Sequence, residues 1–263
     1  MTTSLIITTY NKENYLKLVL DSALRLALLP NEIIIADDGS KEPTKILIEN
    51  YQKIFKKLGV NLKHAYQEDL GFRAAKSRNN AVSLSVSEYI ILTDTDMILH
   101  PYFIQDHLNF AQEKTLLQGS RVILTPKETN NILNANDYEL ALKKRSFKNL
   151  RLPLLSQFIH NTSRTTKQAL LKTPLLSGIR SANMSFFKKD FDAIQGFNEN
   201  FVGWGREDSE FVARFLFNDN ILRRLKFSAL AYHLFHEENS RALLASNHQL
   251  YLDVLKAKNP LWH

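Results

Sequence analysis

Two aspartates, Asp94 and Asp96, close the apolar run Tyr89–Thr93 where a buried strand would meet solvent. In open α/β sheets, ligands bind beyond the carboxyl ends of the strands, and hard carboxylate oxygens there suit Mg²⁺ or Mn²⁺ carrying phosphates. The pair therefore predicts a divalent metal that holds a diphosphate. Asp-x-Asp pairs also occur in turns and at helix starts, so other segments must decide between these interpretations.

Polar residues also end three other strands that the sequence predicts, in the segments Thr8–Asn11, Asp37–Ser40 and Glu68–Gly71. Each segment alone is typical of a turn. Because successive parallel strands present their carboxyl ends on the same side, we expect all of these segments to line one crevice. There, Asp38 can accept a hydrogen bond from the N3–H of a pyrimidine, and Arg73 and Arg78 can neutralise phosphate.

Two histidines, His233 and His236, stand three residues apart at the end of a predicted strand. They could coordinate a metal ion together with Asp96, and imidazole suits Mn²⁺ better than Mg²⁺. A pair of surface or core histidines is the alternative interpretation.

Alternating strands and helices must position these residues. Short β-branched runs predict strands at Ser4–Thr9, Glu32–Ala36, Asn61–Tyr66 and Tyr89–Thr93. Apolar residues at helical spacing predict helices that follow a cap at Asn11, open at Pro43 and cover about Arg73–Leu84. This order predicts an α/β fold with a mainly parallel sheet, helices on both faces and functional loops at one edge.

The second half is less regular. After a helix that starts at Pro101, Gln118–Leu124 is a predicted strand, and the polar, weakly patterned residues 125–177 predict an insertion of helices and mobile loops. Regular patterns then return, with predicted strands at Ala182–Phe187 and Phe227–Phe235 and predicted helices at Glu207–Asn218 and Arg241–Lys256.

Composition limits the class of protein. The 263 residues, 44% of them hydrophobic, suffice for one large or two small domains, and the absence of cysteine excludes disulfides and thiolate chemistry. The net charge of +7 favours anionic partners, which include nucleotide phosphates, nucleic acid and anionic membrane. With neither a signal peptide nor about 18 consecutive apolar residues, a soluble or peripheral cytoplasmic protein is expected.

The densest basic stretch is Lys143–Arg151, in which apolar residues are interleaved. It fits a solvated helix face, or else a contact with a membrane surface or with the phosphate of an acceptor.

Four ordered motifs resemble those of family 2 glycosyltransferases with the GT-A fold: Leu5–Lys12, Ile35–Ser40, Gly71–Asn79 and Asp94–Asp96. The resemblance implies a UDP-sugar donor, with Thr8 and Asp38 near the uracil and Arg73 or Arg78 near the diphosphate. It places Asp94 near the ribose and sugar and Asp96 on the metal, Mn²⁺ or Mg²⁺. Tyr10 and Thr95 belong to the same motifs and are predicted to bind the nucleotide-sugar.

The segment Gly196–Glu210 resembles the acceptor motif of β-1,4-galactosyltransferases and chondroitin-polymerase-type bacterial enzymes. Acidic residues in the first turn of a helix also stabilise it, because they interact favourably with the helix dipole. That effect does not explain a tryptophan between two glycines. The resemblance implies that Asp208 takes the proton of the acceptor hydroxyl, that Glu207 orients acceptor hydroxyls and that Trp204 offers a flat surface to a sugar ring.

Two positions of this motif, Arg206 and Ser209, depart from the galactosyltransferase form, which has Gly and Asp there. In the same pattern, the position of His236 is a metal ligand and the position of His233 contributes to that site.

The prediction is therefore an inverting, metal-dependent glycosyltransferase in three parts: residues 1–125 bind the UDP-sugar, 126–177 are a variable insertion, and 178–263 bind the acceptor and carry the base. The expected acceptor is a bacterial surface glycan such as lipooligosaccharide or capsule, or a lipid-linked saccharide, reached at the inner face of the cytoplasmic membrane. No nucleic-acid partner is expected.

Two other classes stay open. A sugar-nucleotide nucleotidyltransferase would need a glycine-rich pyrophosphate loop near the N-terminus, and Thr8–Glu13 contains no glycine. The net charge would favour a non-catalytic glycan- or nucleic-acid-binding protein, but the carboxylates of the motifs would repel a polyanion. Neither a Gly-x-Ser-x-Gly elbow nor a nucleotide phosphate loop of the Gly-x-x-x-x-Gly-Lys type occurs.

Overall fold

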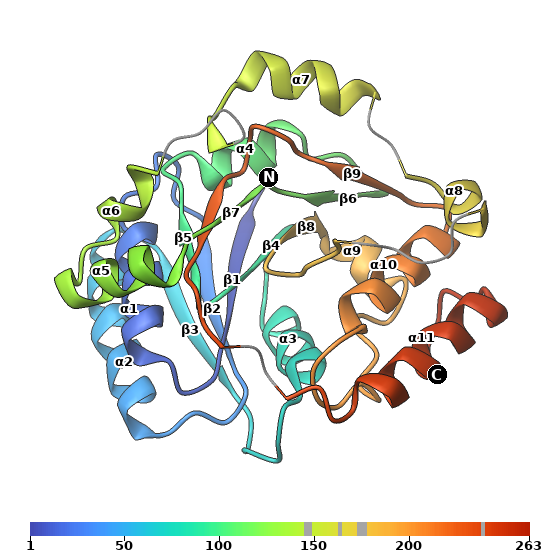
Figure 1. Cartoon of the computed structure of the whole chain (residues 1–263), viewed down its shortest axis with the longest axis horizontal. Coiled ribbons are helices and arrows are strands. Elements are labelled where there is room, and N and C mark those ends of the chain that lie inside the picture. The colour runs from blue at the N-terminus through green and yellow to red at the C-terminus, as the bar shows by residue number, and fades with distance from the viewer. Residues whose placement is uncertain (145–148, 163–164, 173–177, 238–239) are drawn as a thin grey trace.

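A central sheet of seven strands organises the molecule (Figure 1). The computed structural model describes residues 1–144, 149–162, 165–172, 178–237 and 240–263. The strands lie in the order β3-β2-β1-β4-β8-β6-β9. Their bounds are Thr3–Thr9 (β1), Glu32–Asp37 (β2), Asn61–Tyr66 (β3), Tyr89–Asp94 (β4), Thr115–Gln118 (β6), Asn183–Phe187 (β8) and Ile221–Arg224 (β9).

The sheet is parallel except at β8, which runs antiparallel to both β4 and β6. In the parallel part, Thr8 of β1 stands between Ala36 of β2 and Asp94 of β4. The carboxyl ends of β1, β2 and β4 therefore meet the amino end of β8 at one edge of the sheet. The predicted α/β fold with a mainly parallel sheet is confirmed.

Helices cover both faces of this sheet. Figure 1 shows α1 and α2 on one side and α3 and α10 on the other. Alternation along β1 explains the two layers, because Ile6 joins one buried cluster and its neighbours Leu5 and Ile7 join the other. The helices are α1 (Glu13–Ala23), α2 (Glu42–Lys57), α3 (Ala74–Ser83), α4 (Phe103–Asn109), α5 (Pro126–Ala135), α6 (Glu139–Leu142), α7 (Pro153–Thr162), α8 (Lys167–Lys172), α9 (Lys188–Asp192), α10 (Glu207–Phe217) and α11 (Leu244–Ala257).

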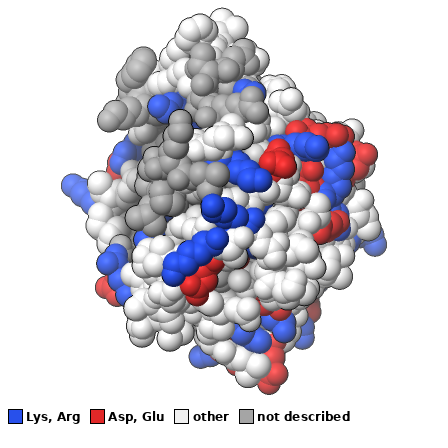
Figure 2. Space-filling view, turned by 90° about the vertical axis from the view of Figure 1, so that its right-hand side faces the viewer, with Lys and Arg blue, Asp and Glu red and all other residues white. Residues whose placement is uncertain are grey.

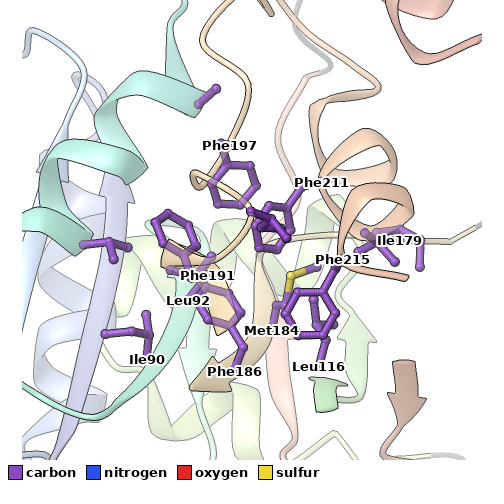
Figure 3. Close-up of a cluster of buried hydrophobic side chains, with 14 of the residues drawn as sticks. Ile90, Leu92, Leu116, Ile179, Met184, Phe186, Phe191, Phe197, Phe211 and Phe215 are labelled. Carbon is purple, nitrogen blue, oxygen red and sulfur yellow. The ribbon is translucent and has the colours of Figure 1, made fainter. Parts of the chain in front are cut away.

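Phenylalanines fix α10 against the sheet (Figure 3). Phe211 of α10 stacks on Phe197 with a centroid separation of 4.2 Å and lies 5.5 Å from Phe186 of β8. Large buried aromatic rings contribute strongly to core stability. The first turn of α10, which carries Glu207 and Asp208, is therefore held at a fixed place beside the sheet.

A second, three-stranded sheet brings distant residues to the end of β4. It consists of β5 (Met97–Leu99), β10 (Ala231–His233) and β7 (Arg121–Ile123), in that order. His233 pairs with Met97 in the antiparallel register, and the backbone N–H of Leu234 donates to the carbonyl of Asp96 at 2.9 Å. This pairing places the histidine segment directly against the Asp94–Asp96 turn.

Some predicted elements differ from the structure. The predicted strand Gln118–Leu124 is wrong as one element: β6 ends at Gln118, and β7 joins the other sheet. At the break, a Cβ on Gly119 would lie 2.2 Å from the side chain of Asn183, so the backbone there passes too close for a regular ladder. Only Ala231–His233 of the predicted strand Phe227–Phe235 is a strand, and the sequence did not predict β5 or β9.

The predicted helix cap at Asn11 is also wrong. Helix α1 begins at Glu13, and Asn11 has a left-handed backbone with φ of 49°. Its side-chain oxygen instead accepts the backbone N–H of Lys41 at 2.8 Å, which ties the end of β1 to the start of α2. An asparagine tolerates this conformation because its short polar side chain bonds locally.

In the predicted insertion, the described residues form α5 to α8. Four residues of the basic stretch, 145–148, lie outside the described residues. Figure 2 shows the side of the molecule that is on the right in Figure 1, where Lys and Arg side chains form a diagonal band across the centre. Within the described ranges, none of the helices is long and apolar enough to span a bilayer.

Candidate active site

A cavity of about 470 Å³ opens at the edge where β1, β2 and β4 end. All of the site residues predicted from the sequence line it except Arg73: Thr8, Tyr10, Asp38, Arg78, Asp94, Thr95, Asp96, Trp204, Glu207, Asp208, His233 and His236. The parallel strands and the second sheet thus bring residues from both halves of the chain into one space.

Asp96, His233 and His236 form a cluster with the geometry of a metal site. One ligand atom from each residue lies within 4.8 Å of the others. Nε2 of His236 is 2.8 Å from Oδ2 of Asp96, and Nε2 of His233 is 3.8 Å from the same oxygen. The other oxygen, Oδ1, is buried and has no hydrogen-bond partner in the described part of the chain. A buried carboxylate oxygen without a donor points to a cation as its partner.

The two histidines differ in protonation. Burial lowers the pKa of His233 to about 4, so its ring is neutral near pH 7 and has a lone pair for a metal. The hydrogen bond between Nε2 of His236 and Asp96 raises the pKa of His236, and its Nδ1 lies 2.7 Å from the carbonyl of Glu237. A metal at this site would therefore replace the proton on Nε2 of His236, while Nδ1 keeps its bond to the carbonyl. Two imidazoles and one carboxylate fit Mn²⁺ by donor type.

Arg78 lies beneath the cavity between three carboxylates. Its guanidinium is 3.4 Å from Asp94, 3.6 Å from Glu207 and 3.6 Å from Asp208. Burial would lower the pKa of Arg78, but the three carboxylates outweigh burial and raise it. The side chain is 4% exposed, so this cation is held in place as a counterion that links the end of β4 to the start of α10. Its predicted contact with the diphosphate stays a prediction.

Two of these carboxylates bind protons more tightly than usual. Burial, together with the nearby Asp96 and Asp208, raises the pKa of Asp94 to about 6. Burial and repulsion from Asp208 raise the pKa of Glu207 to about 7. Acids with such perturbed pKa values in one cavity are typical of functional sites.

Both oxygens of the Asp208 carboxylate have neighbours in the protein. Its Oδ2 accepts the backbone N–H of Ser181, which precedes β8, at 3.0 Å. Its Oδ1 is buried and lies 3.6 Å from a guanidinium nitrogen of Arg78, with no hydrogen-bond partner among the described residues. The carboxylate thus has a fixed orientation at the wall of the cavity.

The loop around Trp204 depends on the glycines beside it. Gly203 and Gly205 have φ of 77° and 108°, a region that favours glycine. A Cβ on Gly203 would lie 2.9 Å from Leu243, and a Cβ on Gly205 would lie 2.8 Å from Leu244. The glycines therefore allow the tryptophan loop to pack against the start of α11 while Trp204 lines the cavity.

A buried ion pair in α10 stabilises the segment that precedes the Trp204 loop. Arg214 and Glu210 of α10 are fully buried and joined by hydrogen bonds of 2.7 and 2.9 Å. The guanidinium also donates to the carbonyls of Ile194 and Gly196. These bonds fix the segment that leads into the Trp204 loop.

Directly after β2, Asp38 is buried and already has protein partners. It accepts the backbone N–H of Arg73 at 2.7 Å and the side-chain amide of Gln67 at 2.5 Å. Burial raises its pKa. The side chain of Arg73 donates to the carbonyl of Glu68 and does not line the cavity. The predicted uracil contact of Asp38 and phosphate contact of Arg73 remain predictions.

Sequence reasoning missed three cations that line the cavity: Lys12, Arg121 and Arg180. Arg121 is in β7 and Arg180 precedes β8, so their positions depend on the second sheet and on the reversed strand. For Lys12 and Arg180 the sequence offered one signal, their closeness to a predicted strand, whereas Arg121 stands in the middle of the predicted strand Gln118–Leu124 and gave no such signal.

Solved structures share this architecture. TarS of S. aureus, residues 1–349 in complex with UDP, matches 98% of this chain and 65% of its own with a TM-score of 0.65 and 16% identity. Mannosyltransferase PcManGT from Pyrobaculum calidifontis, in complex with GDP-Man and Mn²⁺, gives a TM-score of 0.60 at 15% identity over 97% of this chain and 63% of that one. The fold is the GT-A fold of glycosyltransferases.

The chain belongs to glycosyl transferase family 2, whose model matches residues 4–179. The model described as the N-terminal domain of galactosyltransferase matches residues 172–237. These two segments contain the donor motifs and the acceptor motif, respectively, so the resemblance seen in the sequence is confirmed.

Among curated proteins, validoxylamine A glucosyltransferase of Streptomyces hygroscopicus subsp. limoneus is 28% identical over 221 residues, which cover 79% of this chain and 46% of that protein. Chondroitin synthase of Escherichia coli is 27% identical over 249 residues, 88% of this chain and 34% of that protein. The chain thus spans less than half the length of either relative.

Proposed function

We propose that this protein transfers a hexose or N-acetylhexosamine from a UDP-sugar to a hydroxyl of a glycan or lipid-linked saccharide, with inversion at the anomeric carbon. One observation carries the proposal: Arg78 joins Asp94 at the end of β4 to Asp208 at the start of α10 within a single cavity. The strand ends that we propose for the nucleotide and the carboxylate that we propose as the base therefore face the same space.

Asp208 is the base in this proposal. Its carboxylate takes the proton of the acceptor hydroxyl as that oxygen bonds to the anomeric carbon, and the bond from this carbon to the UDP oxygen breaks with its electron pair on UDP. The hydrogen bond from Ser181 holds Oδ2, which orients the carboxylate. Glu207 and Trp204 line the same wall and position the acceptor sugar.

Asp96, His233 and His236 would hold the divalent ion. Such an ion, Mn²⁺ or Mg²⁺, supplies Lewis-acid stabilisation of the charge on a leaving diphosphate. Asp94 and Thr95, in the same turn, bind the ribose and sugar of the donor. In the cell, the proposal places the enzyme in the cytoplasm, in peripheral contact with the inner face of an anionic membrane, where surface-glycan acceptors are built.

Release of UDP tests the proposal. Incubation of the protein with Mn²⁺ and a panel of UDP-sugars should give slow hydrolysis of one donor, detected as free UDP, because water can replace the acceptor. The matched control omits Mn²⁺ and adds a chelator. Failure to bind or hydrolyse every UDP-sugar in the panel would contradict the proposal.

The pH dependence of transfer should report Glu207. Because burial raises its pKa to about 7, Glu207 is protonated below that pH and ionised above it. Only the ionised form accepts hydrogen bonds with both oxygens, so kcat/KM for the acceptor should rise from about pH 6 to about pH 8. Glu207→Gln should remove this step in the pH profile. An unchanged profile in the variant would assign the step to another group.

A further inference from the structure

A second cavity, of about 270 Å³, opens beside the candidate base and is called the arginine pocket here. It shares Arg180, Trp204, Glu207 and Asp208 with the main cavity, so a molecule that occupies it reaches Asp208. Its other lining residues are Ile179, Gly205, Arg206, Ser209, Arg241 and Leu244. Three arginines, Arg180, Arg206 and Arg241, therefore line a space next to the reacting groups.

More arginines than carboxylates line this pocket. The arginines are Arg180, Arg206 and Arg241, and the acids are Glu207 and Asp208. Both acids also lie 3.6 Å from the buried Arg78, which they share with Asp94. Within the part of the chain that the structure describes, neither Arg180 nor Arg206 forms an ion pair with a carboxylate. Guanidinium groups bind carboxylate and phosphate oxygens in a planar, bidentate geometry. The pocket thus has the chemistry of an anion site.

The backbone of Arg206 supports a role for its side chain. Arg206 is the N-cap of α10 and has a left-handed conformation, with φ of 75°. Glycine adopts this conformation without the steric cost that an L side chain brings. Strained residues persist where the surrounding structure or the function requires them. Its guanidinium carbon lies 5.8 Å from the centroid of the Tyr251 ring, so the arginine side chain packs on α11 beside the pocket that Arg206 lines.

The structure also gives the positions of the other two arginines of this pocket, Arg241 and Arg180. Arg241 lies with its guanidinium carbon 5.5 Å from the centroid of the Trp204 ring. Arg180 lines the arginine pocket, the main cavity and a third cavity. A sugar that reaches Asp208 would therefore have cations on more than one side.

We infer that the arginine pocket binds a carboxylate or phosphate group of the acceptor glycan, adjacent to the hydroxyl that is glycosylated. This inference rests on the proposed function and names its acceptor class. The acceptor is anionic, and Arg206, Arg180 and Arg241 determine this specificity.

Three probes test the inference with protein that is loaded with UDP and Mn²⁺: methyl glucuronide, methyl glucoside 6-phosphate and neutral methyl glucoside. Dissociation constants come from saturation-transfer NMR titrations, which do not require turnover. At least one charged probe should bind about tenfold more tightly than the neutral probe, and added salt should weaken only the charged probes. The stronger charged probe identifies the anion as carboxylate or phosphate.

The variant Arg206→Gly tests the effect of the arginine charge on probe binding separately from the stability of the fold. The variant should lose about tenfold in affinity for the charged probe and keep its affinity for the neutral probe. Its melting temperature should stay close to that of wild type, because relief of the left-handed backbone offsets the lost contact with the Tyr251 ring. The KM of the UDP-sugar should not change. Lys258→Gly is the matched control, because Lys258 is an exposed cation with φ of 54° at the end of α11, away from the pocket.

Three results would overturn the inference: equal binding of neutral and charged probes, absence of binding by all probes, or unchanged discrimination in Arg206→Gly. A KM for the UDP-sugar that rises in this variant would place the arginine on the donor and would overturn it as well. If the wild-type protein fails to bind UDP, the proposed function fails. If UDP binding and transfer persist without anion preference, only the inference fails.

Discussion

Replacing Asp208 by Asn is expected to lower the rate of transfer by about a thousandfold, because a positioned general base contributes about 10²- to 10⁴-fold. The amide keeps the size of the side chain and can still accept the N–H of Ser181, but it cannot take a proton. UDP affinity should stay within about twofold of wild type, since the change removes an interaction of the transition state. Single-turnover kinetics and UDP calorimetry measure the two quantities.

Asp253→Asn is the matched control for this variant. Asp253 is an exposed carboxylate on α11 whose ion-pair partner is Lys256, 3.9 Å away. Its substitution should leave transfer unchanged. Full activity in Asp208→Asn would remove Asp208 as the base, and a loss of UDP affinity equal to the loss of rate would assign it to donor binding.

Removing Asp96, the acid of the candidate metal site, should have an effect of similar size. Asp96→Asn is expected to reduce Mn²⁺-dependent transfer by about a thousandfold or more, because Lewis-acid stabilisation of the leaving group is worth several kcal/mol, or about 10³-fold. His236→Ala should weaken Mn²⁺ binding about 10- to 100-fold, since Asp96 and His233 remain. Electron paramagnetic resonance of free Mn²⁺ gives the affinities without turnover.

His263→Ala serves as the control for the histidine variant, because His263 is exposed at the end of the chain. Its Mn²⁺ titration should match that of wild type. A titration that is unchanged in both Asp96→Asn and His236→Ala would show that these residues do not bind the ion.

Much of the site was predictable because its residues follow directly from strand ends. Thr8, Asp38, Asp94 and Asp96 follow or end continuous apolar runs, and parallel strands place such residues together without further information. The pairing of His233 with Met97 was not predictable, because β5 and β10 are only three residues long and leave a weak pattern.

Other features depend on tertiary contacts that no local pattern reports. Arg73 belongs to a donor motif, yet its side chain bonds to the carbonyl of Glu68 instead of lining the cavity. The run Gln118–Leu124 looks like one strand, and only the close approach of Asn183 to Gly119 shows why it is divided between two sheets. Arg180 lines all three cavities because of the direction of β8, which its sequence does not specify.

The reversed direction of β8 has a consequence for how such enzymes diversify. A strand parallel to its neighbours would send the preceding segment to the opposite end of the sheet, whereas β8 begins beside the proposed base, where Ser181 meets Asp208. Changes of length or composition ahead of β8 therefore affect the side of the cavity that we propose for the acceptor. The turns after β1, β2 and β4, which we propose for the nucleotide, are not altered by such changes. Under the proposed function, selection can thus alter what is glycosylated while the donor stays the same.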